Sequence, residues 1–216
     1  MIMMIRWGLK ENMTLIISSK TYKKMKIYAK QMDKDEIGGL LLGKINSNGD
    51  ILLKNAIILK QVKTCSTFEL DNDAMMDLTK NGSPKLLNSI IGWWHSHAKM
   101  DTFWSSVDSD CFKRLSEFSG LCVGIVVNSR GRKIMPMRCR IDFKTRDEKY
   151  ISVDDIKPEL DTSFFNFVSE DRIREEIKEK VKEEPPIIFN NIFHKNDKES
   201  NLENIKEEEL KEGLFC

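Results

Sequence analysis

The 216-residue sequence contains no apolar stretch that approaches the roughly 18 residues needed for a membrane-spanning helix. It also has almost no net charge, because 35 Lys and Arg side chains offset 34 Asp and Glu side chains to leave +1. A strongly basic nucleic-acid-binding protein is therefore not indicated. Gly38, Gly39 and Gly43 do not have the spacing of a G-x-G-x-x-G phosphate-binding loop. The sequence predicts neither a membrane nor a nucleic-acid partner.

Cysteine is scarce and irregularly placed. The five cysteines are an odd number, and none of them forms a C-x-x-C pair. The apolar start, Met1 to Trp7, is too short for the apolar part of a signal peptide, and no small-residue cleavage site follows it. We therefore expect reduced thiols in a cytoplasmic protein.

Hydrophobic residues make up 40% of the sequence and charged residues 32%, which favours one core and a charge-rich remainder. Residues 1–154 carry 25 Lys and Arg against 17 Asp and Glu, a net charge of +8, whereas residues 155–216 carry 10 against 17, or −7. We expect a domain over residues 1–150 and an acidic, partly helical extension over residues 151–216. The extension is either a solvated surface, a segment that covers the body, or a site for a further partner.

Hydrophobic periodicity predicts alternating strands and helices. The expected strands are Leu15–Ser18, Ile37–Ile45, Ile51–Lys60, a strand ending at Phe68, Ile90–Trp94, Leu121–Val127 and Lys133–Phe143. The turn Asn46–Asp50 should join two of them in a hairpin. The expected helices run from Ser18 or Ser19 to Gln31, over Asp71–Lys80, from Ser105 or Ser106 to Phe118, and weakly near Leu202–Leu210.

The extension carries its own apolar pattern. Ile173, Ile177 and Val181 recur every four residues after an apolar cluster at Phe164–Val168. Because a helix of about 12 residues is marginal alone in water, we expect this stripe to dock on the body. Residues after Pro185-Pro186 are expected to be mobile.

Two of the three histidines stand together in His95-Ser96-His97. Positions i and i+2 of an extended segment point the same way, so both imidazoles can face one metal ion. Asp108, at the start of a predicted helix, could supply a third ligand. Three protein ligands leave a position for water, the pattern of a catalytic zinc site. A general base is still needed, and Glu36 is a candidate by elimination.

Each of these residues has a simpler explanation when taken alone. The histidine pair could end a strand or lie on a solvated loop. Ser105 could be only a helix N-cap, Asp108 only a helix-start residue, and Glu36 only a surface carboxylate. The three tryptophans Trp93, Trp94 and Trp104 are more typical of packing than of substrate contact.

The joint pattern H-S-H-x₇-S-x₂-D, formed by His95, His97, Ser105 and Asp108, resembles the signature of the JAMM, or MPN-plus, metalloprotease family. The upstream segment Glu36-Ile-Gly-Gly-Leu-Leu-Leu-Gly43 resembles the glutamate element of that family. The resemblance covers roughly residues 14–145. It implies an α/β fold in which a curved mixed sheet is flanked by helices.

The resemblance also implies roles for the residues that match. His95, His97 and Asp108 would bind one zinc ion. Glu36 would hold and deprotonate the attacking water and pass the proton to the leaving amine. Ser105 would hydrogen-bond the oxyanion of the tetrahedral intermediate.

The function implied by the resemblance is zinc-dependent hydrolysis of peptide or isopeptide bonds at the C-terminal tail of a ubiquitin-like modifier. The alternatives are a non-catalytic scaffold of the MPN type, or a metal-dependent amidase acting on a small molecule or cell-wall peptide. Many family members have Pro after the second histidine, where this sequence has Ala98. Long insertions are absent, so specificity for one ubiquitin-chain linkage is not expected.

Overall fold

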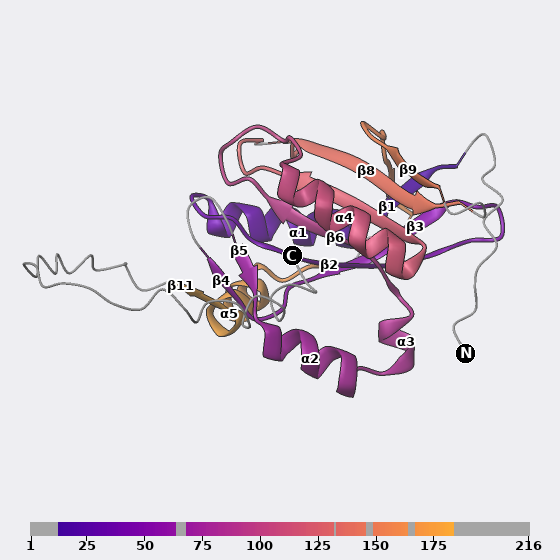
Figure 1. Cartoon of the computed structure of the whole chain (residues 1–216). Coiled ribbons are helices and arrows are strands. Elements are labelled where there is room, and N and C mark those ends of the chain that lie inside the picture. Colours follow the sequence, from indigo (N-terminus) through magenta and orange to yellow (C-terminus); the bar gives the residue numbers. More distant parts are fainter. Residues whose placement is uncertain (1–12, 64–67, 132, 146–148, 164–166, 184–216) are drawn as a thin grey trace, which may run out of the picture.

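The computed structural model describes residues 13–63, 68–131, 133–145, 149–163 and 167–183. The strands of its main sheet are β1 (Leu15–Ser18), β2 (Gly38–Ile45), β3 (Ile51–Ile57), β6 (Ile90–Ser96), β7 (Leu121–Val127), β8 (Met137–Lys144), β9 (Tyr150–Val153) and β10 (Glu159–Asp161). These eight form a mixed sheet in the order β10-β1-β3-β2-β6-β7-β8-β9. Helix α1 (Ser19–Met32) covers one face and α4 (Ser106–Ser119) the other (Figure 1). The predicted α/β fold with a curved mixed sheet is confirmed.

The first helix and the hairpin that follows it form as the sequence predicts. Ser18 caps α1 by accepting a hydrogen bond from the backbone of Thr21. In the turn between β2 and β3, the Asn46 side chain accepts hydrogen bonds from the backbones of Asn48 and Asp50, each at 2.9 Å. Gly49 has φ +90°, a left-handed conformation that glycine adopts without a steric penalty.

Side chains on β6 alternate between the two faces of the sheet. Trp94 stacks on Tyr28 of α1, with ring centroids 5.5 Å apart. Trp93 points to the opposite face, where it meets Phe112 of α4. Because successive strand residues alternate, His95 shares the α4 face with Trp93. The alternation of side chains along β6 therefore decides on which face of the sheet the histidines lie.

The buried face of α4 differs in part from the sequence prediction. The spacing of Val107, Cys111 and Leu115 predicts that they share one apolar face of the helix, but Cys111 is buried whereas Val107 is 66% exposed. The inward position of the first turn belongs to Asp108, which faces His95. Phe112, fully buried, completes the apolar face that Cys111 begins.

The C-terminal extension packs on the body as predicted. Helix α5 (Glu170–Lys180) lies beside α1, with Ile173 buried in the core and the Tyr28 hydroxyl 2.6 Å from Glu176. Strand β11 (Val181–Glu183) joins β4 (Gln61–Lys63) and β5 (Phe68–Leu70) in a three-stranded sheet. The predicted boundary near residue 150 falls at the start of β9, so the extension also supplies strands to the main sheet. The segment after Pro185-Pro186 lies outside the described residues.

Two further elements lie between β5 and β6. The predicted helix over Asp71–Lys80 is α2 (Asn72–Asn81), and the short α3 (Pro84–Leu87) follows it.

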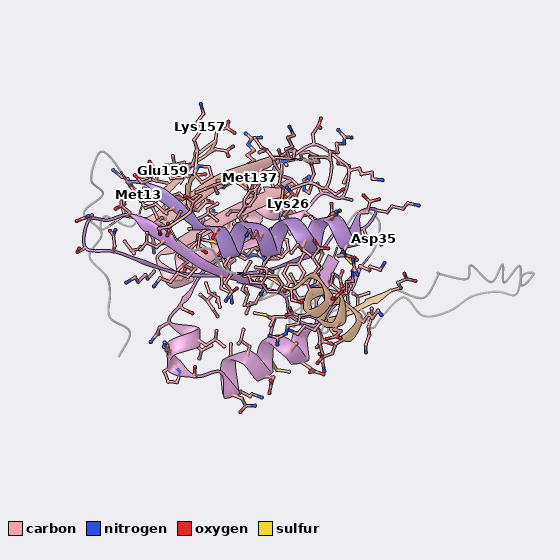
Figure 2. The ribbon with its side chains drawn as sticks, turned by 180° about the vertical axis from the view of Figure 1, so that it is seen from behind. Met13, Lys26, Asp35, Met137, Lys157 and Glu159 are labelled. Carbon is pink, nitrogen blue, oxygen red and sulfur yellow. The ribbon has the colours of Figure 1, made fainter. Side chains whose placement is uncertain are left out.

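Figure 2 shows α1 from the side opposite to Figure 1, with Lys26 on its outer surface and Asp35 just beyond its end. None of the helices in the described part of the chain is long and apolar enough to cross a membrane.

The cysteines are not all reduced, in contrast to the prediction from their spacing. Cys111 is disulfide-bonded, whereas Cys122 and Cys139 are free thiols in the interior. Burial raises the pKa of both free thiols, which keeps them protonated and unreactive. Cys65 and Cys216 lie outside the described residues.

Candidate metal centre

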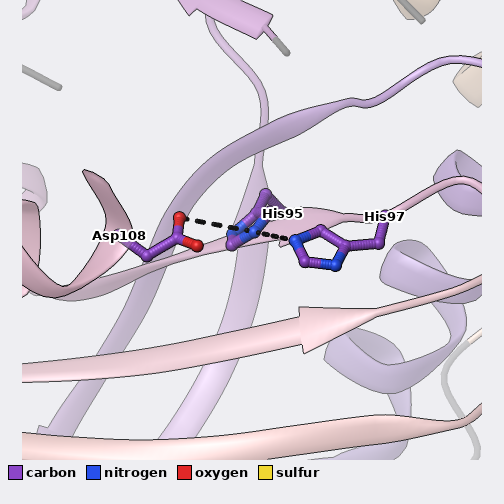
Figure 3. Close-up of side chains that lie close together, drawn as sticks. All are labelled: His95, His97 and Asp108. Carbon is purple, nitrogen blue, oxygen red and sulfur yellow. Dashed lines mark hydrogen bonds and ion pairs between the residues drawn. The ribbon is translucent and has the colours of Figure 1, made fainter. Parts of the chain in front are cut away.

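The two histidines meet at the end of β6. The Nε2 atoms of His95 and His97 lie 3.0 Å apart, and both side chains are buried (Figure 3). His97 Nδ1 is 2.9 Å from the carbonyl oxygen of Asp101, which can only accept, so Nδ1 carries the proton. The unprotonated Nε2 of His97 is then available to a metal ion. This placement agrees with the expectation that residues at positions i and i+2 of an extended segment point the same way.

Asp108 reaches the histidines from the first turn of α4. Its Oδ2 accepts hydrogen bonds from the backbone nitrogen and the hydroxyl of Ser105, at 2.8 and 2.7 Å. The Ser105 hydroxyl in turn caps the Asp108 backbone nitrogen, which completes a capping box. With Oδ2 held in this way, Oδ1 faces His95 Nε2 at 3.5 Å (Figure 3).

The donor atoms of these three side chains lie close enough together to hold one metal ion. They all lie within 4.8 Å of one another, and no other group of three or more His, Cys, Asp or Glu in the described residues is placed to hold a metal. Zinc–ligand bonds of about 2.0–2.2 Å in a tetrahedron place neighbouring ligand atoms about 3.3–3.6 Å apart. Burial lowers the pKa of His95, which keeps its imidazole in the neutral form that a metal requires.

Glu36 lies beside this cluster, on the segment between α1 and β2. Gly38 pairs with His95 in the antiparallel register, and Ile37 is hydrogen-bonded to the backbone and hydroxyl of Ser96. Continued by one residue, the register sets Glu36 opposite His97, on the same face. Glu36 is 6% exposed, and burial, helped by the charge of Asp108, raises its pKa to about 8. A carboxyl group whose pKa lies near neutral pH suits a proton-transfer role.

Aromatic side chains surround the cluster. Phe103 packs edge-on against His97 at 4.5 Å between ring centroids, and Trp93 and Trp104 approach His95 at 5.6 and 6.3 Å. Trp104 is held by a 2.7 Å hydrogen bond to Asp154, in the loop after β9. The side chains of Met100, Phe103 and Val107, which are neighbours of the site residues in the sequence, are exposed. Sequence reasoning missed Asp101, Phe103 and Asp154, whose types and spacing carry no ligand pattern.

Ala98 gives the loop after the histidines a distinct backbone conformation. Its φ is +45°, whereas proline is fixed near −65°, so the residue common in the family cannot adopt the conformation found here. The Ala98 carbonyl oxygen accepts hydrogen bonds from the backbone and hydroxyl of Ser129, at 2.9 and 3.1 Å. The loop is thus tied to the end of β7.

The chain thus combines a mixed sheet between two helices with a buried His-His-Asp cluster, which could hold a metal ion, at the end of a central strand. The family model described as "JAB1/Mov34/MPN/PAD-1 ubiquitin protease" matches residues 10–119, and the chain belongs to this family.

Two curated relatives are similar over 119 residues at 27% identity: the 26S proteasome regulatory subunit RPN11 of Eremothecium gossypii and the ubiquitin carboxyl-terminal hydrolase RPN11 of Saccharomyces cerevisiae. The match covers 53% of this chain and 38% of each relative. The solution structure of DSY2949 from Desulfitobacterium hafniense matches with a TM-score of 0.42 and 22% identity, over 68% of this chain and 96% of that one.

Proposed function

We propose that this protein is a zinc-dependent metalloprotease that hydrolyses a peptide or isopeptide bond at the C-terminal tail of a ubiquitin-like modifier. The observation that carries the proposal is the buried cluster of His95, His97 and Asp108 together with the buried carboxyl of Glu36, whose pKa is raised by burial and by the charge of Asp108. The family membership and the activity named for the yeast relative support the reaction class.

In this mechanism His95, His97 and Asp108 would hold the metal. When bound, zinc acts as a Lewis acid that polarises the scissile carbonyl and makes the attacking water more acidic. Glu36 accepts a proton from that water and delivers it to the leaving nitrogen. The exposed apolar side chains of Met100, Phe103 and Val107 would contact the substrate beside the reacting bond and exclude water.

The hydroxyl of Ser105 has two competing tasks. It has a single proton, which it donates to Asp108 Oδ2. Donation to the oxyanion of the tetrahedral intermediate requires the hydroxyl to turn away from Asp108. Asp108 would still accept from the Ser105 backbone nitrogen, so its orientation would survive this rotation.

Ser105→Ala distinguishes the two tasks. Loss of the oxyanion donor should lower kcat by roughly 10²–10³-fold, and loss of the cap should lower stability by about 1 kcal/mol. Ser83→Ala is the control, since Ser83 caps α3 in the same way outside the site. Thermal unfolding and steady-state kinetics on both variants measure the two effects. A lower Tm with unchanged kcat would leave Ser105 only its capping role.

The substrate class is tested by incubating the zinc-loaded protein with fusions in which modifiers ending in Gly-Gly precede a reporter, and with cell-wall peptides. Cleavage after the glycine pair, abolished by a chelator and restored by zinc, is the expected result. Cleavage of the peptides alone would favour an amidase. Stoichiometric zinc without turnover on any substrate would favour a non-catalytic scaffold.

A further inference from the structure

The side chain of Gln61, on β4, is buried. Its amide makes the two hydrogen bonds that the backbone of a neighbouring strand would otherwise make. Its Oε1 accepts from the Gly38 nitrogen at 3.1 Å, and its Nε2 donates to the Gly38 oxygen at 2.9 Å. A third bond, of 3.1 Å, runs from Nε2 to the carbonyl oxygen of Leu59. One amide side chain thus satisfies both backbone groups of a residue that stands two positions after Glu36.

The main sheet leaves this part of β2 incomplete on one side. Pairing of β2 with β6 includes Gly38, but pairing with β3 begins only at Leu40. Gln61 supplies the missing hydrogen bonds at Gly38. The segment that carries Glu36 is therefore held between Ser96 of β6 on one side and Gln61 on the other.

Strand β4 contacts the chain both before and after Glu36, and the C-terminal extension holds β4 in place. Lys63 Nζ lies 2.5 Å from Asp35 Oδ2, directly before Glu36, and 3.1 Å from Glu183 of β11. Val181 to Glu183 pair in parallel with Gln61 to Lys63. Lys180 also donates a 3.1 Å hydrogen bond to the carbonyl oxygen of Ile58. The C-terminal extension thereby supports the strand from which Gln61 projects.

We propose that Gln61 is a positioning residue for Glu36, acting through the backbone of Gly38. The inference rests on the proposed function, since it assumes that Glu36 transfers the proton. A displacement of about 1 Å of a reacting group can cost roughly 10²-fold in rate. Without Gln61, two buried backbone groups at Gly38 lose their partner, and the segment shifts to regain one.

The test is Gln61→Met, which keeps the length of the side chain and removes its hydrogen bonds. We expect kcat to fall roughly 10- to 100-fold, with KM and zinc content unchanged. Thr21→Val is the matched control. Thr21 is fully buried, and its hydroxyl donates to the Leu53 carbonyl in the core, away from the site. This control should lower Tm and leave kcat unchanged.

A double variant separates positioning from general weakening of the fold. In a Glu36→Gln background, Gln61→Met should cause no further loss of the residual turnover, because the group that it positions is gone. A second readout does not depend on activity: hydrogen exchange at the Gly38 amide should accelerate in Gln61→Met and not in Thr21→Val.

Three results would overturn the inference. Unchanged kcat in Gln61→Met, an equal loss with and without Glu36, or unchanged exchange at Gly38 would each show that Gln61 does not position the base. If the wild-type protein with zinc cleaves none of the fusions, the proposed function fails, and the inference falls with it. An active wild type with an unaffected Gln61→Met refutes the inference alone.

Discussion

Replacing His97 with alanine is expected to remove bound zinc and hydrolysis together. Two ligands, His95 and Asp108, would remain, too few for the three-ligand arrangement of a catalytic zinc site. The wild-type protein should hold about one zinc per chain, and His97→Ala close to none after dialysis. Activity should fall to the level of the chelated wild type. Metal analysis by mass spectrometry, together with cleavage of the modifier fusion, measures both quantities.

The control for this experiment is Asp110→Asn. Asp110 lies on α4 two residues after Asp108, is exposed, and does not belong to the cluster. It should retain zinc and turnover. Full zinc occupancy and wild-type cleavage in His97→Ala would show that the metal, and the reaction, lie elsewhere in the molecule.

Replacing Glu36 with glutamine is expected to leave zinc in place and lower kcat by about two orders of magnitude or more, as for other general acid–base groups. The amide has nearly the shape of the carboxyl but cannot accept the proton of the attacking water. Glu117→Gln, an exposed position on α4, is the matched control and should have wild-type kinetics. An empty metal site in Glu36→Gln would make Glu36 a ligand and not the base.

The same variant should be at least as stable as the wild type in the metal-free state. Burial, then the charge of Asp108, raises the folded-state pKa of Glu36 from 4.5 to about 8. The unfolded chain therefore ionises first, and the ionised carboxyl destabilises the fold increasingly as pH rises from about 4.5 to about 8. Glutamine carries no such charge, so its advantage in Tm should grow over that window. Thermal unfolding at pH 5 and pH 8 measures it.

Local signals predicted the elements that carry the candidate metal site. The i and i+2 spacing of His95 and His97 places both on one face once β6 is extended. Ser105 and Asp108 form a capping box that can be recognised from sequence because it involves neighbouring residues. Glu36 was a candidate only by elimination until the family resemblance implied its role, since nothing local links it to histidines 59 and 61 residues later.

The features that the sequence did not predict depend on contacts between distant segments. Strands β9, β10 and β11 are three or four residues long, and β9 and β10 are mostly exposed, so they lack the alternation that identifies a strand. Gln61 looks like an ordinary polar residue until β4 lies beside Gly38. Val107 is exposed while its neighbour Asp108 is buried, so the apolar spacing alone did not identify the buried face of the first turn of α4.

The pairing of β10 and β11 has a consequence for handling the protein. β10 covers the outer edge of β1, and β11 covers one edge of β4. A fragment ending at residue 150 would leave both edges with unsatisfied backbone groups, which other chains can use to form intermolecular sheets. Such a fragment would retain His95, His97, Asp108 and Glu36 and still aggregate. A form shortened at its C-terminus should therefore keep the residues up to Glu183, so that both edges stay covered.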